Sequence, residues 1–271
     1  MSLLATEASG FHVPPLDELF NFPAFLFEDS EYFAFNRTAL LYVLAMFISV
    51  GLLWAAFAKP KVVPGKFQAA MEAIVDFVSG IGHEVIGHQA KPYIPFLTSL
   101  FLFVWINNLY EILPFVNFPS TGRMALPAFL AIVVYVVYWW AAIKAQGLGY
   151  FKHLIVPEGV PKFVLPLYAP IELAQVLIIR PLTLAVRLFA NMMAGHILLT
   201  ILFIAANAFL FDVHDGLANV SFNLKGSPIG LIALLFGPAM VAFELMVGAL
   251  QAYIFTILAA VYIGSSLSEE H

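Results

Sequence analysis

Cysteine is absent from the chain, and charged residues are scarce, at 11% of 271 residues. Without cysteine, disulfides, thiolate metal sites and cysteine nucleophiles are excluded. A soluble globular domain is typically about 25% charged and about 45–50% apolar, whereas 62% of this chain is hydrophobic. The chain therefore has too little polar surface for a soluble protein and belongs in a membrane. Its net charge of −5 argues against nucleic acid as a partner.

Lysine and arginine are also missing from residues 1–36, which contain six acids and three prolines. This composition predicts a polar, acidic tail over residues 1–37, followed by one membrane domain over residues 38–271. No signal peptide is expected, since no basic stretch precedes a short apolar run. His83 and His88 are five positions apart, so on a helix they diverge by about 140° and cannot easily share a metal. We expect no enzymatic site, metal or cofactor.

Five apolar stretches are long enough to be embedded in a membrane, since a crossing helix needs about 20 apolar residues. They cover approximately residues 38–58, 94–114, 124–145, 167–211 and 229–266. Residues 65–87 differ, because their apolar side chains recur every three or four positions from Phe67 to Val85 and form one helical stripe. This pattern predicts an amphipathic helix at the membrane interface. The expected fold is an all-α polytopic membrane protein of about five embedded helices and one interfacial helix.

The last two apolar stretches are too long for an upright crossing. As helices with a rise of about 1.5 Å per residue, they would measure roughly 67 and 57 Å, against a hydrocarbon core about 30 Å thick. Either they are broken, with Pro170, Pro181 and Pro238 as candidate bends, or both are steeply tilted. We expect steep tilt, because a continuous helix leaves fewer backbone groups unsatisfied in lipid.

Lysines gather in two loops, one between the first two crossing stretches and one after the third. The positive-inside rule puts both loops on the cytoplasmic side. The amino terminus is then expected outside, and five crossings bring the carboxyl terminus to the cytoplasm.

Two arginines lie within the fourth apolar stretch, where a charge costs about 2.5–3.5 kcal/mol on insertion scales. Arg180 directly precedes Pro181 and has two interpretations: it reaches the inner headgroups by snorkelling, or it is functional. Arg187 is seven residues deeper, which makes snorkelling harder and favours a functional role. Because arginine keeps its proton under ordinary conditions, it suits a permanent positive barrier better than a proton carrier.

Other polar residues accompany the arginines. His196 follows Arg187 by nine positions, which puts it on the opposite side of one helix, about 13.5 Å away in depth. In the fifth stretch, Glu244 and Gln251 are seven positions apart and nearly on one face. If Glu244 lies opposite His196 on an antiparallel helix, Gln251 falls near the level of Arg187. A His–Glu pair there is either a proton relay or a buried ion pair that holds two helices together.

Further polar atoms lie close to these groups in the expected fold. Asn191 is one turn beyond Arg187, on the arginine face. Asn107, Asn108 and Glu111 lie near the outer end of the second stretch. Glu111 has two interpretations, as part of the same polar group or as a plain interfacial acid.

Two segments carry a resemblance to a known family. The run RPLTLAVRLFANMMAGH at 180–196 resembles the signature of subunit a of the rotary F-type ATP synthase. The run FELMVGALQAYIF at 243–255 is similar to the last helix of that family. The segment 108–114 and the amphipathic helix with Gln68 and Glu72 also match, so the resemblance covers most of the chain from about residue 38 onward.

The resemblance implies a stator subunit beside a ring of small proteolipids, the c-ring, whose subunits each carry a membrane carboxylate. It implies two aqueous half-channels that end at the ring, and a peripheral-stalk b-type subunit as a further partner. Arg187 matches the essential arginine, which attracts the ring carboxylate and separates the channels. Proton-relay and half-channel positions are matched by His196, Glu244, Gln251, Asn191, Asn108 and Glu111, of which all but Asn191 match the path from the outside. Glu172 matches an inner half-channel position only loosely in spacing.

The resemblance makes a bacterial plasma membrane the expected location, with an organellar inner membrane left open. Protons are the expected ion, since the histidine and the carboxylates can titrate. The competing interpretation is a secondary transporter with a polar site at the membrane midplane. It predicts inverted halves, which the sequence does not show.

Overall fold

The computed structural model describes residues 24–26, 35–113, 116, 120–147, 149–150, 163, 165–214, 219–222 and 228–267. Within these residues the regular secondary structure is helical apart from two small antiparallel hairpins. This architecture confirms the expected all-α class of membrane protein.

The main helices follow the apolar stretches closely. They are α2 (Arg37–Phe57), α3 (Lys66–Val85), α4 (Ile94–Ile112), α5 (Ala125–Gln146), α7 (Leu165–Ala174), α8 (Arg180–Leu210) and α9 (Pro228–Leu267). Three shorter helical elements connect them: η2 (Gly87–Gln89), η3 (Ser120–Gly122) and the π-helix η4 (Gln175–Ile179). The hairpins pair β1 (Ala24–Leu26) with β2 (Phe35–Asn36), and β3 (Phe211–His214) with β4 (Asn219–Phe222).

Among the described residues, four helical stretches are long and apolar enough to cross a membrane: α2, α5, the continuous α7–α8 stretch, and α9. The expected number of five embedded helices is reached only by counting α4, which is shorter and less apolar. The reason is that α4 carries Asn107, Asn108 and Glu111, and all three side chains are buried in the protein. Helix α4 is therefore a central helix of the bundle whose polar residues are shielded from lipid.

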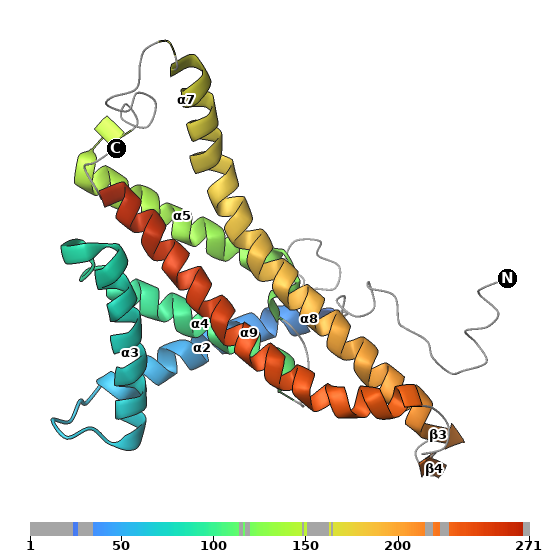
Figure 1. Ribbon diagram of the computed structural model, residues 1–271. Coiled ribbons are helices and arrows are strands. Elements are labelled where there is room, and N and C mark those ends of the chain that lie inside the picture. Colours follow the sequence, from blue (N-terminus) through green and yellow to red (C-terminus); the bar gives the residue numbers. More distant parts are fainter. Residues whose placement is uncertain are drawn as a thin grey trace.

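Helices α8 and α9 make the most extensive contact in the molecule, and Figure 1 shows them side by side, joined at one end through the β3–β4 hairpin. Both α4 and α5 pack against α9, and α5 also contacts α8. The centre of this core is closed to solvent, since Leu97, Val104, Leu188 and Phe255 are fully buried. The side chains on α8 and α9 are thereby held at fixed positions relative to α4.

Both long stretches are continuous helices, as expected, but neither is regular. The fourth stretch passes from α7 through the π-helix η4 into α8 without an interruption. Helix α9 contains Pro238 and is visibly bent near its amino-terminal end in Figure 1. The steep tilt of both helices relative to the membrane stays a prediction.

Helix α3 is amphipathic, as its sequence pattern indicates, and it lies across the direction of the other helices in Figure 1. Met71, Val78 and Ile81 from its apolar stripe are buried, and the helix packs against α4 and α9. Phe67, at the start of the stripe, is exposed. The stripe therefore serves mainly to dock α3 onto the bundle.

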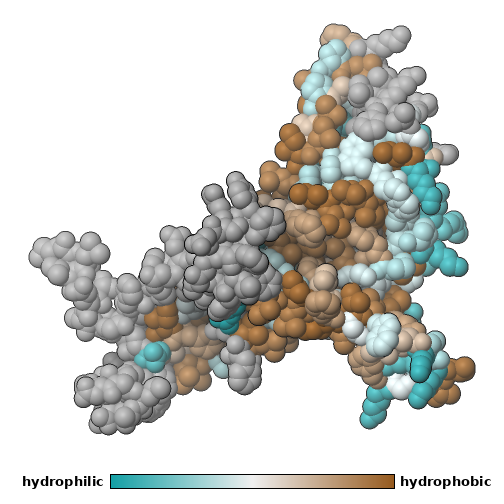
Figure 2. Space-filling model, turned by 180° about the vertical axis from the view of Figure 1, so that it is seen from behind, coloured by the Kyte–Doolittle hydropathy of each residue, from teal (hydrophilic) through white to brown (hydrophobic). Residues whose placement is uncertain are grey.

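The expected acidic tail falls mostly outside the described residues, and all six of its acids lie there. Its described part includes the β1–β2 hairpin, which the composition of the tail does not predict. Elsewhere the surface is strongly apolar. Figure 2 shows hydrophobic residues over much of the described part of one face, with hydrophilic residues along an edge. Large exposed side chains such as Phe47, Trp54 and Phe129 contribute to this surface, which suits contact with lipid.

Candidate functional site

Polar side chains from α4, α8 and α9 gather in the interior of the bundle. All of them are buried, and we call them the polar cluster: Asn107, Asn108, Glu111, His196, Glu244 and Gln251. Buried charged residues are rare in proteins unless they are paired or functional. The structure therefore buries, in one bundle, six polar residues that the sequence analysis had named.

His196 is paired with a different acid from the one expected. Its Nδ1 lies 3.9 Å from Oε1 of Glu111, and the two side chains are 8% and 1% exposed. The sequence predicts Glu244 as the partner, because residue spacing relates only α8 and α9 to each other. Glu111 reaches the histidine from α4, which packs against α9. Burial also rules out the interpretation of Glu111 as a plain interfacial acid.

Glu244 lies against the backbone of Gly195, the residue before His196. A Cβ atom at Gly195 would be only 2.4 Å from Oε2 of Glu244. The level of Glu244 relative to His196 is therefore close to that expected, although the contact is with the neighbouring glycine. Glu244 also interacts electrostatically with Glu111, so three titratable groups share this part of the bundle.

Several polar atoms of the cluster lack hydrogen-bond partners among the described residues. They are Oε1 of Glu111, Oε2 of Glu244 and Nε2 of Gln251. The large majority of buried polar atoms in proteins have a partner, so this concentration of unpaired atoms is unusual. The two carboxylate oxygens among these atoms have free acceptor capacity, and Nε2 of Gln251 is an amide donor.

Asn108 ties the cluster to its surroundings. Its Nδ2 donates to the backbone carbonyl oxygen of Gly248 on α9 at 3.0 Å, and its Oδ1 accepts from Oγ1 of Thr121 at 3.3 Å. Gly248 permits this approach, because a Cβ there would lie 3.3 Å from Cβ of Asn108. Sequence reasoning missed Thr121, whose position after α4 carries no distinguishing pattern. It also missed Gly195, although a glycine beside an intramembrane histidine is a signal of close approach.

Arg187 lies on the other side of α8 from His196, as its spacing predicts. Its side chain is exposed, and the part of the chain that the structure describes offers it no hydrogen bond or ion pair. Asn191, one turn further on, is half-buried, and its Nδ2 has no partner among the described residues. The arginine face of α8 thus presents a free cation at the surface of the protein.

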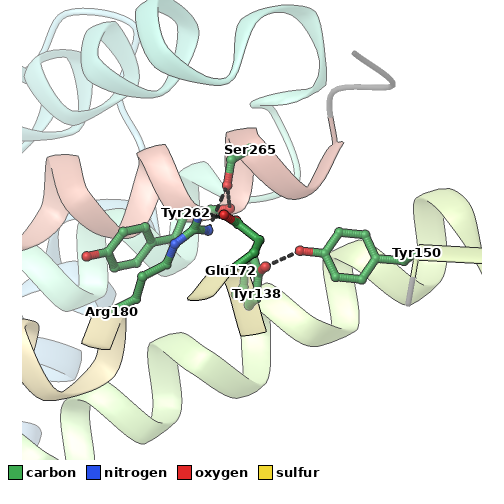
Figure 3. A network of polar contacts seen from close by, with 6 residues as sticks. All are labelled: Tyr138, Tyr150, Glu172, Arg180, Tyr262 and Ser265. Carbon is green, nitrogen blue, oxygen red and sulfur yellow. Dashed lines mark hydrogen bonds and ion pairs between the residues drawn. The ribbon is translucent and has the colours of Figure 1, made fainter. Parts of the chain in front are cut away.

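Arg180 is not a simple snorkelling side chain, because it is held by groups within the protein. Figure 3 shows it extending toward Glu172 and Ser265 beside the ring of Tyr262. Its Nη2 lies 3.8 Å from Oε1 of Glu172, and its Nη1 donates to Oγ of Ser265 at 3.5 Å. The guanidinium carbon is 5.7 Å from the centroid of Tyr262. Of the two arginines on this helix, Arg180 is therefore paired with an acid, and Arg187 has no ion pair among the described residues.

A hydrogen bond between two tyrosine hydroxyls lies next to this arginine. Tyr138 of α5 and Tyr150 are its partners, and both residues are buried. The rings of Tyr138 and Tyr150 also meet edge to face. This contact fixes the segment after α5 beside the α7–α8 junction.

Comparison with known proteins shows the family of the chain. Residues 39–264 match the family described as ATP synthase A chain. The chain belongs to that family. A curated relative named ATP synthase subunit a, from Streptomyces lividans, is 41% identical over 98% of this chain and 91% of the relative. Relatives of the same name from Parafrankia sp. and Rhodococcus erythropolis are 39% and 37% identical, over 98% and 100% of this chain and 88% and 96% of the relatives.

As an ATP synthase A chain, the protein is a multi-pass membrane protein and the proton-translocating subunit of the membrane sector of an F-type ATP synthase. It is one component of a larger complex and is not the catalytic subunit. The family resemblance of its arginine run is thereby confirmed. The alternative of a secondary transporter receives no support from these matches.

Proposed function

We propose that this ATP synthase A chain forms two half-channels against a ring of proteolipid c subunits, and that Arg187 separates them. The observation that carries the proposal is the free, exposed side chain of Arg187 on an apolar helix. An unpaired charge in a membrane is costly unless a counter-charge is available. A carboxylate on each ring subunit supplies that counter-charge, and the ring moves when the carboxylate gains or loses its proton.

On this proposal, the polar cluster forms the outer half-channel. A proton passes between Glu111 and His196, which are 3.9 Å apart, and continues past Glu244 toward the ring. Gln251 and Asn191 contribute polar atoms along the way. The buried oxygens of Glu111 and Glu244 that accept no hydrogen bond favour a relay over a purely structural ion pair, because a pair kept only for stability gains by satisfying every acceptor.

The proposed orientation has the amino terminus outside a bacterial plasma membrane and the carboxyl terminus in the cytoplasm. It follows from the lysine-rich loops before α4 and after α5. A b-type subunit of the peripheral stalk is the proposed second partner, which would keep the subunit from turning with the ring. In this arrangement, the face of α8 and α9 that carries Arg187 contacts the ring.

Cross-linking tests the proposed contact directly. Because the chain has no native cysteine, an introduced cysteine is the only thiol of this subunit that can react. Ala190 is exposed on α8, one turn after Arg187. We expect Ala190→Cys to cross-link to a cysteine introduced beside the ring carboxylate in the assembled complex. Trp54→Cys, exposed on α2, is the matched control and is expected to give no such product. Equal yields at the two positions, or a product only at Trp54→Cys, would contradict the proposed rotor face.

Gly195→Ala is expected to slow ATP synthesis about tenfold, because small misplacements of a reacting group are costly. The added Cβ would lie 2.4 Å from Oε2 of Glu244, so the flexible carboxylate must move. Synthesis is measured in vesicles energised by an imposed proton gradient, at matched subunit content. Gly80→Ala is the control, since no atom lies within 4 Å of its added Cβ. Identical rates for the two variants would show that the position of Glu244 is unimportant.

A further inference from the structure

Two arginines lie on the same face of α8. Arg180 and Arg187 are seven residues apart, so their directions differ by only about 20° and their levels by about 10.5 Å. A cavity of about 340 Å³ lies beside the first of them, between the η4–α8 junction and α9, and is lined by Ile179, Arg180, Thr183 and Tyr262 among others, but not by Arg187. Thr183 is one turn from Arg187. A carboxylate that moves along this face is therefore exposed to two fixed positive charges in succession.

Only one of the two charges is compensated by the chain itself. Arg180 has an ion pair with Glu172, a hydrogen bond to Ser265 and the ring face of Tyr262. Arg187 has no hydrogen bond or ion pair within the described ranges. Both side chains carry the same permanent charge. The two positions therefore differ in the charge that surrounds each guanidinium group.

The π-helix η4 accounts for the pairing of Arg180. Glu172 and Arg180 are eight residues apart, a spacing that would turn them about 80° away from each other on a regular α-helix. A π-turn takes up one extra residue, so that the eight positions act as seven and the two side chains return to within about 20°. The π-turn lies between them, at Gln175–Ile179. The helix geometry thus aligns the acid with the first arginine.

Packing does not explain the position of Glu172. Helix α7 buries none of its side chains, and its extended contacts are with η4. Figure 1 shows α7 projecting beyond the other helices. The ion pair to Arg180 and the hydrogen bond that continues to Ser265 connect this exposed helix to α9.

We propose that Glu172 neutralises Arg180, so that Arg187 is the uncompensated cation that a moving ring carboxylate meets on this face. The proposal rests on the proposed function, because it presupposes a carboxylate that travels past α8. Without Glu172, Arg180 becomes a second site of attraction about 10.5 Å from the first. A carboxylate held there in its charged form delays each step of the ring. Glu172 is then a positioning residue for the charge of Arg180 and carries no proton itself.

A double variant that removes both charges of the pair tests the proposal. Glu172→Gln frees Arg180 and is expected to slow ATP synthesis about fivefold, the scale of a partly exposed ion pair. In Glu172→Gln combined with Arg180→Gln, the rate is expected to return to within about twofold of the unaltered protein. Glu84→Gln is the matched control, because Glu84 is an exposed acid on α3 outside the network. Rates are measured in the assembled complex at matched subunit content.

The double variant separates charge from structure. If the Glu172–Arg180 pair acts only as a clamp, the double variant remains as slow as Glu172→Gln, which would overturn the proposal. An unaltered rate for Glu172→Gln alone would overturn it as well. Arg187→Gln in the same vesicles tests the proposed function separately. If Arg187→Gln is inactive while Glu172→Gln is unaffected, the barrier role stands and only the neutralisation is wrong.

Discussion

Replacement of Arg187 by alanine is expected to abolish coupled ATP synthesis. The side chain is exposed, carries a permanent charge and has no partner among the described residues of its own chain. Alanine removes the attraction for the ring carboxylate and the electrostatic barrier between the two half-channels. Protons are then able to pass without turning the ring. The measurement is ATP synthesis in vesicles energised by an imposed proton gradient, together with the passive proton leak of the same vesicles.

The control for this variant removes a cation elsewhere. Lys91 is exposed in the segment before α4, away from the polar cluster and the rotor face. Lys91→Ala is expected to leave synthesis unchanged at equal subunit content. Normal synthesis in Arg187→Ala vesicles would eliminate the barrier role, whatever the effect on assembly.

The helices of this fold could be predicted from the sequence because the chain has so few charges. Apolar stretches of about 20 residues leave little choice of boundary, and α2 and α5 begin and end within two residues of expectation. Helix α4 was also predicted, but its role was not. A count of apolar residues treats Asn107 and Glu111 as defects in a crossing helix. In the structure they are the reason why α4 lies inside the bundle.

Those features of the site that depend on the geometry of a single helix could be predicted from the sequence. Helical geometry puts Arg187 and His196 on opposite sides of α8, and the structure has one exposed and the other buried. The partner of His196 could not be predicted from the same argument, because Glu111 comes from a third helix. Tertiary packing decides such a contact, and the spacing of residues along α8 and α9 contains no information about α4.

The pairing of Glu172 with Arg180 was missed for a different physical reason. Sequence periodicity assumes 3.6 residues per turn throughout a helix. The π-helix η4 changes the phase between α7 and α8, so the predicted directions are wrong for every residue before it. The run Gln175–Ile179 contains neither proline nor glycine that would have marked this irregularity.

His196→Ala is expected to slow ATP synthesis roughly a hundredfold, the scale of losing a group that transfers protons, while the complex remains assembled. The imidazole lies 3.9 Å from Glu111, and the residue before it lies against Glu244, so its loss interrupts the proposed relay between the two acids. Alanine leaves the helix intact, because α8 is held mainly by apolar contacts such as that of Leu188. The measurement combines the synthesis rate with the amount of subunit that co-purifies with the ring.

The matched control is His88→Ala, since His88 is an exposed histidine outside the polar cluster. It is expected to change neither assembly nor rate. The two interpretations of the buried histidine differ in what the alanine variant loses. A relay predicts an assembled and slow complex, because the Glu111 carboxylate is left without its 3.9 Å partner but can be protonated and stay neutral. A structural ion pair predicts that the complex is lost from the membrane, since α4 and α8 would lose a contact that holds them together.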